Sequence, residues 1–230
     1  MVRIMVVEDE MSIRSFIVLN LKRSGFDVVE AESGEEALDY LKSGPMVHIM
    51  LLDVMLPELD GFTVCKRVRA VNDKMGIIML TAKVQETDKV NGLTLGADDY
   101  ISKPFSPVEM VARVKSLIRR LKLGTNKDEN LSSGPFILLL NEGRLLKNGE
   151  TIELTPTEYD ILLRLMENNN QSLTRDELLD DVWGKTYVGD TKIVDVNIRR
   201  LRQKIEDDPS HPEFIKTHWG RGYMWDGERQ

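Results

Sequence analysis

Short apolar runs and longer amphipathic segments alternate along the first half of the chain. The runs RIMVVE, DVVEA, HIMLLD, GIIMLTA and DYISK have the length of buried strands, and segments with helical periodicity separate them. Strands that alternate with helices predict a parallel sheet covered on both faces. We therefore expect residues 1–122 to form an α/β domain with a doubly wound, five-stranded parallel sheet.

The pattern changes in the second half. Residues 123–135 are polar, contain Gly and Ser and lack periodicity, as is typical of a linker. Strand-like pieces follow, with a hairpin signal at Asn148-Gly149, then three helical patterns and two short closing strands. This order predicts that residues 136–230 form an α+β winged helix-turn-helix domain whose third helix, at 191–206, reads DNA.

Helix starts carry the clearest local signals. A Ser or Thr followed three residues later by Glu predicts a capping box, in which the two side chains bond each other's backbone N–H groups. Four predicted helix starts carry such a pair: Ser33 with Glu36, Ser106 with Glu109, Thr155 with Glu158, and Thr174 with Glu177.

Composition fits an ordinary globular protein, with 41% hydrophobic and 30% charged residues. No apolar run approaches the ~18 residues of a membrane span, and the chain opens on a strand rather than a signal peptide. Cys65 is the single cysteine, so neither a disulfide framework nor a Cys-based zinc site is expected. These features favour a cytoplasmic protein with no membrane partner.

The net charge differs between the two halves of the chain. Residues 1–122 carry 17 basic and 18 acidic residues, a net −1, and residues 123–230 carry 14 and 20, a net −6. Within the acidic half, Lys192 to Lys204 holds five basic residues and one acid, a net +4. A local basic stripe on an acidic body can still bind DNA, because salt screens the more distant charges.

Polar residues end four of the predicted strands of the first half. They are Glu8-Asp9, Asp53, Thr81 and Lys103. Because the carboxyl ends of neighbouring parallel strands meet at one rim, these groups are expected to converge there. Three crowded carboxylates need a cation, and all-oxygen ligands beside a phosphoryl group favour Mg²⁺.

Asp53 stands alone at the end of a central strand, which makes it the preferred nucleophile toward phosphorus. The plainer interpretation, that strand-end acids only cap the following helices, explains Glu8 or Asp9 singly but not the whole set. A haloacid-dehalogenase-type phosphatase would place a second Asp two residues after the nucleophile, where this chain has Met55. A free-standing enzyme has little support, since no separate substrate cleft or general base is apparent.

The stretches VVEDE, LLDVMLPELDG, MLTAK and GADDYISKPF resemble the flavodoxin-like receiver domain of two-component response regulators. The resemblance implies that Asp53 accepts a phosphoryl group from a sensor histidine kinase. It implies that Mg²⁺ is held by Glu8, Asp9, Asp53 and the Met55 backbone carbonyl. The only chemistry then expected is self-phosphorylation and slow dephosphorylation of Asp53.

Three further roles follow from the resemblance. Thr81 would hydrogen-bond the phosphoryl oxygens, and Lys103 would pair with them, with a cis peptide bond before Pro104. Tyr100 would swing inward as Thr81 moves. In OmpR/PhoB receivers the fourth helix, fifth strand and fifth helix form an active homodimer. The corresponding charges are Lys89, Asp98, Asp99, Glu109, Arg113 and Arg120, with Lys89–Glu109 and Asp99–Arg113 suggested as pairs between subunits.

In the third helix of the second domain, Val194, Ile198, Leu201 and Ile205 share one face at about 100° per residue and predict its core stripe. The resemblance to the OmpR/PhoB subfamily extends through ELTPTEYDILLRL, LTRDELLDDVW, VDVNIRRLRQKIE and GRGY. It implies base contacts from Val196 and Arg200. Residues implied to meet mostly phosphates of promoter DNA are Lys192, Asn197, Arg199, Arg202 and Thr217. The loop GKTYVGD would face RNA polymerase.

The wing departs from the family pattern, because Trp219 stands where the subfamily usually has an arginine. Arg221 could substitute for it from the turn, the wing could contribute less to binding, or Trp219 could pack along sugars. The favoured function is a transcription factor switched by phosphorylation. The alternative is a phosphorylation-switched regulator that binds protein and whose winged domain does not read DNA.

Overall fold

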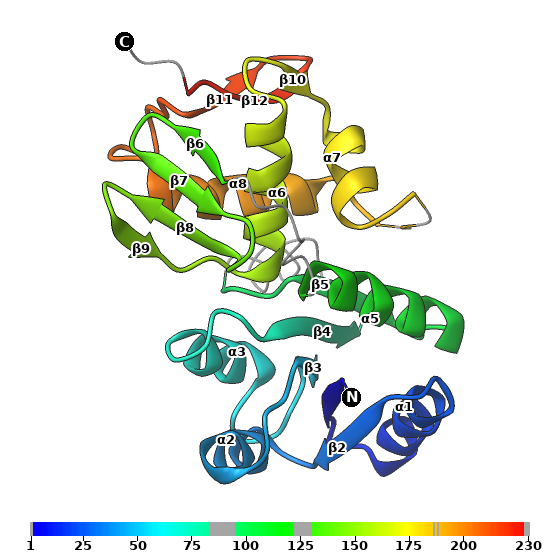
Figure 1. Ribbon diagram of the computed structural model, residues 1–230. Helices are drawn as coiled ribbons and strands as arrows, with labels where there is room; N and C mark the ends of the chain where they lie inside the picture. The colour runs from blue at the N-terminus through cyan, green and yellow to red at the C-terminus, as the bar shows by residue number, and fades with distance from the viewer. Residues whose placement is uncertain (1, 83–94, 122–129, 186, 188, 228–230) are drawn as a thin grey trace. The chain divides into compact units, whose positions relative to one another are not determined.

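The computed structural model describes residues 2–82, 95–121, 130–185, 187 and 189–227. The chain forms two compact units, Met1–Ile118 and Arg119–Gln230 (Figure 1). Among the described residues, no helix is long and apolar enough to cross a membrane.

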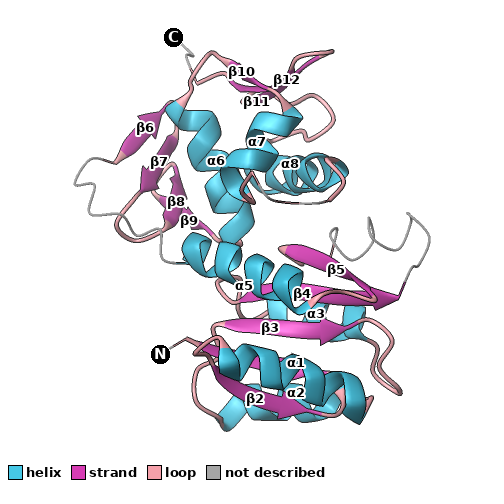
Figure 2. Cartoon of the chain, turned by 90° about the vertical axis from the view of Figure 1, so that its right-hand side faces the viewer, coloured by secondary structure: helices cyan, strands magenta, loops and turns pink. Residues whose placement is uncertain are grey.

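The first unit is built on a five-stranded parallel sheet. Its strands are β1 (Arg3–Val7), β2 (Asp27–Ala31), β3 (Ile49–Asp53), β4 (Gly76–Ala82) and β5 (Asp99–Lys103). They lie in the order β2-β1-β3-β4-β5, so the order reverses at β1 and β3 (Figure 2). In such sheets the functional site lies at the carboxyl ends of the strands beside this reversal.

Helices cover both faces of this sheet. The helices are α1 (Met11–Arg23), α2 (Gly34–Ser43), α3 (Gly61–Arg69) and α5 (Pro107–Leu121), with α1 and α5 on one face and α2 and α3 on the other (Figures 1 and 2). Every residue of β3 is buried, which explains why its sequence is a continuous apolar run that ends in Asp53. The predicted doubly wound fold is confirmed. The fourth helix, expected around Lys89, lies almost wholly outside the described residues.

The second unit combines two antiparallel sheets with three helices. One sheet holds β6 (Leu131–Ser133), β7 (Phe136–Leu139), β8 (Arg144–Lys147) and β9 (Glu150–Ile152). The helices α6 (Pro156–Glu167), α7 (Arg175–Val182) and α8 (Lys192–Ile205) follow. The other sheet has the order β10-β12-β11 and contains β10 (Ser172–Leu173), β11 (Ile215–His218) and β12 (Gly222–Trp225). This arrangement is the predicted winged helix-turn-helix.

Two details of the second unit differ from the sequence prediction. β6 lies within the stretch 123–135 that we expected to be linker, because Leu131–Ser133 pairs with Phe136–Leu138 in an antiparallel ladder. β10 was not predicted. It is only two residues long, and its register with Leu173 opposite Tyr223 is set by a distant part of the chain.

Candidate functional site

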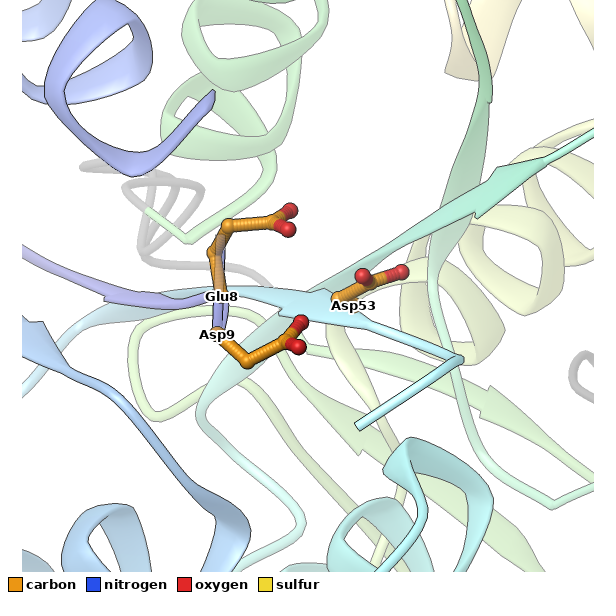
Figure 3. A group of neighbouring side chains, drawn as sticks. All are labelled: Glu8, Asp9 and Asp53. Atoms are coloured by element: carbon orange, nitrogen blue, oxygen red, sulfur yellow. The ribbon is translucent and has the colours of Figure 1, made fainter. Parts of the chain in front are cut away.

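Three carboxylates meet at the carboxyl ends of β1 and β3. Glu8 and Asp9 directly follow β1, and Asp53 is the last residue of β3 (Figure 3). One oxygen from each carboxylate lies within 4.8 Å of the others. Glu8 and Asp53 are buried, whereas Asp9 is exposed. The predicted convergence of these acids is therefore present in the structure.

Lys103 brings a positive charge to the same place from the end of β5. Its ammonium Nζ lies 2.7 Å from Glu8 Oε2 and 2.8 Å from Asp53 Oδ2. The side chain is mostly buried, with 18% of its surface exposed. The peptide bond between Lys103 and Pro104 is cis, as expected. One lysine thus holds two carboxylates that would otherwise repel each other.

The charges in this cluster shift one another's protonation. Burial raises the pKa of Glu8, and the nearby Asp53 charge raises it further, against the opposing effect of Lys103. Burial alone would lower the pKa of Lys103, but its hydrogen bonds and charge contacts with Asp53 and Glu8 outweigh burial, so its pKa is raised. The lysine therefore stays charged, but its single positive charge does not balance a cluster of three acidic residues.

Thr81 and Met55 complete the rim. Thr81, in β4, is buried, and its Oγ1 donates to the Ala82 carbonyl at 2.8 Å. The Met55 backbone N–H donates to Asp53 Oδ1 at 3.3 Å. A Cβ on Gly61 would collide with the Asp53 carbonyl oxygen, so the glycine allows α3 to begin directly against the end of β3. Tyr100 lies buried in β5, opposite Met79 of β4.

The donor set of this cluster fits a hard cation. Glu8, Asp9 and Asp53 offer only oxygen atoms as ligands, and two of them, Glu8 and Asp53, are buried. Such oxygen ligands, with room for water on the exposed Asp9 side, suit Mg²⁺ better than a transition metal. Among the described residues, this is the group of acids that meets the geometric requirement for holding a metal ion.

Four of the six charges expected at a dimer surface have partners inside the first unit. Arg113 Nη1 lies 3.2 Å from Asp99 Oδ1, and Arg113 Nη2 lies 2.9 Å from Glu109 Oε1. Asp98 is fully buried and accepts from Arg69 Nη2 at 2.8 Å, so it is not a surface charge as we expected. Its side chain is held inward by Arg69 and by the Ile77 N–H. Lys89 lies outside the described residues. Arg120 is buried in the second unit, where its Nη1 donates to Thr157 Oγ1 at 2.6 Å, so it is not a surface charge as we expected.

In the second unit, α8 has the predicted core stripe. Val194, Ile198, Leu201 and Ile205 are all buried. Lys192, Arg199 and Gln203 are exposed on the other side of the helix. Two positive charges and an amide on one exposed face form a surface suited to the phosphates and base edges of DNA.

Arg200 differs from the expectation that it contacts bases. Its side chain is only 7% exposed, and Nη2 lies 2.7 Å from Oε1 of the fully buried Glu158 on α6. Lys204 binds the other oxygen of Glu158 at 2.9 Å. Burial alone would raise the pKa of Glu158, but Arg200 and Lys204 outweigh burial and lower it. In this structure, therefore, Arg200 ties α8 to α6 and does not present its guanidinium to a ligand.

Four further residues that were expected to touch DNA are buried or bonded within the second unit, namely Val196, Asn197, Arg202 and Thr217. Asn197 is fully buried and donates to the Ile193 carbonyl, and Val196 is also buried. Arg202 donates to the Ile215 carbonyl and to Thr217 Oγ1 at 2.8 Å, which joins α8 to β11. The helical periodicity predicted the core residues of α8 correctly. More of the helix surface is buried than these four residues indicated, because Val196, Asn197 and Arg200 are buried as well.

The wing between β11 and β12 exposes the side chain that departs from the family pattern. Trp219 is 92% exposed, and Arg221 is exposed two residues later. Gly220 and Gly222 at the turn have positive φ angles of 74° and 109°. At Gly222 any side chain would collide with the Leu173 carbonyl, so β12 can approach β10 closely only with glycine there.

Two important residues escaped the sequence reasoning. Arg14, in the first turn of α1, contacts the backbone of the acidic cluster, and Glu158 organises the buried charges between α6 and α8. Glu158 was recognised only as half of a capping box, which it also forms with Thr155. Neither role has a signal in residue spacing, because both depend on contacts between separate elements.

Comparison with known proteins agrees with this architecture. Residues 4–115 match the family described as the response regulator receiver domain, and residues 149–225 match the family described as transcriptional regulatory protein, C terminal. The response regulator DrrB of Thermotoga maritima, described as an OmpR/PhoB homolog, is 34% identical. That similarity covers 99% of this chain and 100% of DrrB, with a TM-score of 0.53.

Two other solved structures are similar. A mutant of RitR is 27% identical over 99% of this chain and 100% of its own, with a TM-score of 0.79. The receiver domain of the Francisella response regulator 1452 is 34% identical, covers 53% of this chain and 100% of its own, and has a TM-score of 0.51. Since the matches extend over both units, this chain belongs to the two-component response regulators of the OmpR/PhoB family and binds DNA.

Proposed function

We propose that Asp53 is the phosphoacceptor and that a sensor histidine kinase supplies the phosphoryl group. The observation that supports this most strongly is the single ammonium of Lys103 within 2.8 Å of Asp53 and 2.7 Å of Glu8. This contact holds the Asp53 carboxylate at the rim of the sheet, where one of its oxygens can attack phosphorus. The new bond joins Asp53 Oδ to phosphorus as the bond from phosphorus to the kinase imidazole breaks.

Glu8, Asp9, Asp53 and the Met55 carbonyl would hold Mg²⁺ at this site. When bound, Mg²⁺ neutralises charge on the carboxylates and on the transferred phosphoryl oxygens. Lys103 then pairs with a phosphoryl oxygen in place of an Asp53 oxygen, and the Thr81 hydroxyl turns from the Ala82 carbonyl to donate to another. Tyr100 and Thr81 lie on the adjacent strands β5 and β4. We therefore expect Tyr100 to move inward when the Thr81 hydroxyl turns toward the phosphoryl group.

The output we propose is homodimerisation followed by binding to promoter DNA in the cytoplasm, where RNA polymerase is also a partner. Exposed positions of α8 and the wing would contact the duplex, namely Lys192, Arg199, Gln203, Trp219 and Arg221. Arg113 would exchange its Asp99 contact within the chain for one across the dimer. Beyond acceptance and slow hydrolysis of the phosphoryl group at Asp53, no reaction is proposed.

Intact-mass spectrometry tests the phosphoacceptor. The full chain is incubated with Mg²⁺ and a small-molecule phosphoryl donor, beside an Asp53→Asn variant that keeps the size of the side chain. We expect one phosphoryl adduct on the wild type and none on the variant. An adduct of equal yield on Asp53→Asn would show that another residue is the acceptor, and no adduct on a folded wild type would show that the regulator works without phosphate.

A second candidate output has one observation in its favour. Val196, Asn197 and Arg200 are buried, so the second domain could act through protein binding without reading DNA sequence. A titration of duplex DNA binding across salt concentrations separates the two. A DNA reader should lose affinity steeply as salt rises, because phosphate contacts release counterions. Binding that is weak and insensitive to salt would favour the protein-binding alternative.

A further inference from the structure

Arg14 is a buried guanidinium beside the acidic cluster that the proposed phosphorylation chemistry does not use. It lies in the first turn of α1, and its side chain is 6% exposed. Nη1 donates to the Glu8 carbonyl at 2.8 Å and to the Asp9 carbonyl at 3.2 Å. Arg14 therefore holds the backbone of two of the three residues whose carboxylates form the cluster.

The far end of the guanidinium is anchored at the end of the neighbouring strand β2, on Glu32 just after it and Glu30 within it. Nη2 donates to Glu32 Oε1 at 2.6 Å, and Nε lies 3.8 Å from Glu30 Oε2 at β2. Hydrogen bonds between ionised groups at this distance are among the stronger ones in proteins. The planar fork of arginine presents separate nitrogens to the carbonyls and to the carboxylate, whereas a lysine must donate to all of them from one nitrogen.

These contacts fix a short connection whose geometry matters for the site. Residues 8–10 join β1 to α1, and the Glu8 N–H bonds the Ala31 carbonyl at 3.2 Å. Arg14 additionally binds the backbone carbonyls of Glu8 and Asp9. Rotation of either peptide unit would move a carboxylate away from Asp53, so the direction of both side chains depends on where Arg14 holds their carbonyls.

We propose that Arg14 is a positioning residue for the cation site, holding Glu8 and Asp9 through their backbone in the geometry that Mg²⁺ requires. This inference rests on the proposed binding of Mg²⁺ by Glu8, Asp9 and Asp53. It goes further by assigning cation affinity to a residue that contributes no ligand atom. Mg²⁺ demands near-ideal octahedral geometry, which makes its affinity sensitive to small displacements of a carboxylate.

The chain offers a matched control for the loss of an arginine between β1 and β2. Arg3 joins the same two strands at their opposite ends, through Asp27 Oδ2 at 2.7 Å. Asp27 lies opposite Arg3 in the β1–β2 ladder, four positions from the Val7–Ala31 pair that ends it. Replacing Arg3 should weaken the attachment of β2 without moving Glu8 or Asp9.

The test is a Mg²⁺ titration of the full chain followed by ¹H–¹⁵N NMR, with thermal unfolding measured in parallel. The proteins are wild type, Arg14→Lys, Glu32→Gln and Arg3→Lys. We expect Mg²⁺ to bind Arg14→Lys about tenfold more weakly than wild type, the lower end of the range for residues that support metal ligands. Glu32→Gln should weaken binding in the same direction but less, and Arg3→Lys should leave it unchanged.

Three results would overturn the inference: unchanged Mg²⁺ affinity in a folded Arg14→Lys, unchanged affinity in Glu32→Gln when Arg14→Lys does not fold, or an equal loss in Arg3→Lys. Each of these leaves the wild type binding Mg²⁺, so the proposed function would stand. A wild type that does not bind Mg²⁺ would instead remove the cation from the proposed function, and the role of Arg14 with it.

Discussion

Lys103 and Arg200 each hold a buried carboxylate, but their surroundings give them different roles. Lys103 stands at the rim of the sheet, and its partner Asp53 is a group that phosphorylation would change. Arg200 is enclosed between α6 and α8, and its partner Glu158 also caps α6. The first pair is therefore suited to be rearranged by a signal, and the second to keep two helices together.

This difference predicts distinct effects of two adjacent arginines on α8. Arg199→Ala should keep its stability but bind duplex DNA more weakly, with the slope of log affinity against log salt reduced by about 1. Arg200→Ala should lose about 3–5 kcal/mol of unfolding free energy, because it leaves the Glu158 charge buried without its main partner. DNA titrations across salt and denaturant unfolding of both variants measure these effects.

One result for Arg200→Ala would contradict this assignment. An Arg200→Ala protein that is as stable as the wild type, but no longer discriminates between DNA sequences, would restore the base-reading role implied by the family resemblance. Unfolding of the second unit can be followed by fluorescence, since all three tryptophans of the chain, Trp183, Trp219 and Trp225, lie in that unit.

The charge of Glu158 also predicts how stability depends on pH. Its folded pKa is lowered from the ordinary 4.5 by Arg200 and Lys204 against the effect of burial, so the unfolded chain takes up the proton first as pH falls. The stabilisation is thus complete above 4.5 and is lost as pH falls through the folded pKa. Glu158→Gln lacks this contribution, so its unfolding free energy should be lower than that of the wild type at pH 7. The difference between the two proteins should become smaller in acid. A deficit that stays constant with pH would contradict the assignment.

At the level of elements, the helix starts were the most predictable features. All four predicted pairs have the Ser or Thr side chain accepting from the Glu backbone N–H, as at Ser33 and Ser106. The full reciprocal box forms at Thr155 and Thr174, whereas at Ser33 the Glu36 side chain accepts from the Glu32 N–H instead. Asn148 and Gly149 both have positive φ, at 53° and 85°, as the predicted hairpin turn requires. These features are local, so a few consecutive residues suffice to specify them.

The remaining elements required contacts that spacing does not encode. β10 exists because β12 pairs with it, and the covered arc of α8 is set by α6 and the buried Glu158. Similarly, the strand ends predicted that Asp53, Glu8 and Asp9 converge, but not that Arg14 holds the connection between β1 and α1. Sequence reasoning located the three carboxylates and missed Arg14, which bonds the backbone of two of them.

The capping boxes give a prediction at this scale. Thr174 caps α7 through the Glu177 N–H at 3.1 Å, so Thr174→Ala should cost about 1 kcal/mol of unfolding free energy in the second unit. Thr191 precedes α8 but makes no side-chain capping bond, and Thr191→Ala is therefore the matched control, with no loss expected. Equal losses in denaturant unfolding of the two variants would mean that the capping bond does not stabilise α7.

For the whole molecule, the two units divide the work. The first holds the acidic cluster, and the second holds the basic face of α8 and the wing. The net charge of −7 belongs mainly to the second half, yet Lys192 and Arg199 are exposed on the same face of α8, where DNA would lie in the proposed function. In the proposed function, a phosphoryl group on Asp53 would alter a surface of the first unit and so change how copies of the second unit meet DNA.

The most direct test of this account is the affinity of the full chain for a duplex selected from a random library, measured with and without a phosphoryl donor. The measurement is made in Mg²⁺ at fixed salt, beside Asp53→Asn. We predict that the donor tightens binding by the wild type about tenfold, within the usual range of coupling between sites, and leaves Asp53→Asn unchanged. Equal affinity with and without the phosphoryl group on Asp53, or an equal response by the variant, would contradict the claim that Asp53 controls DNA binding.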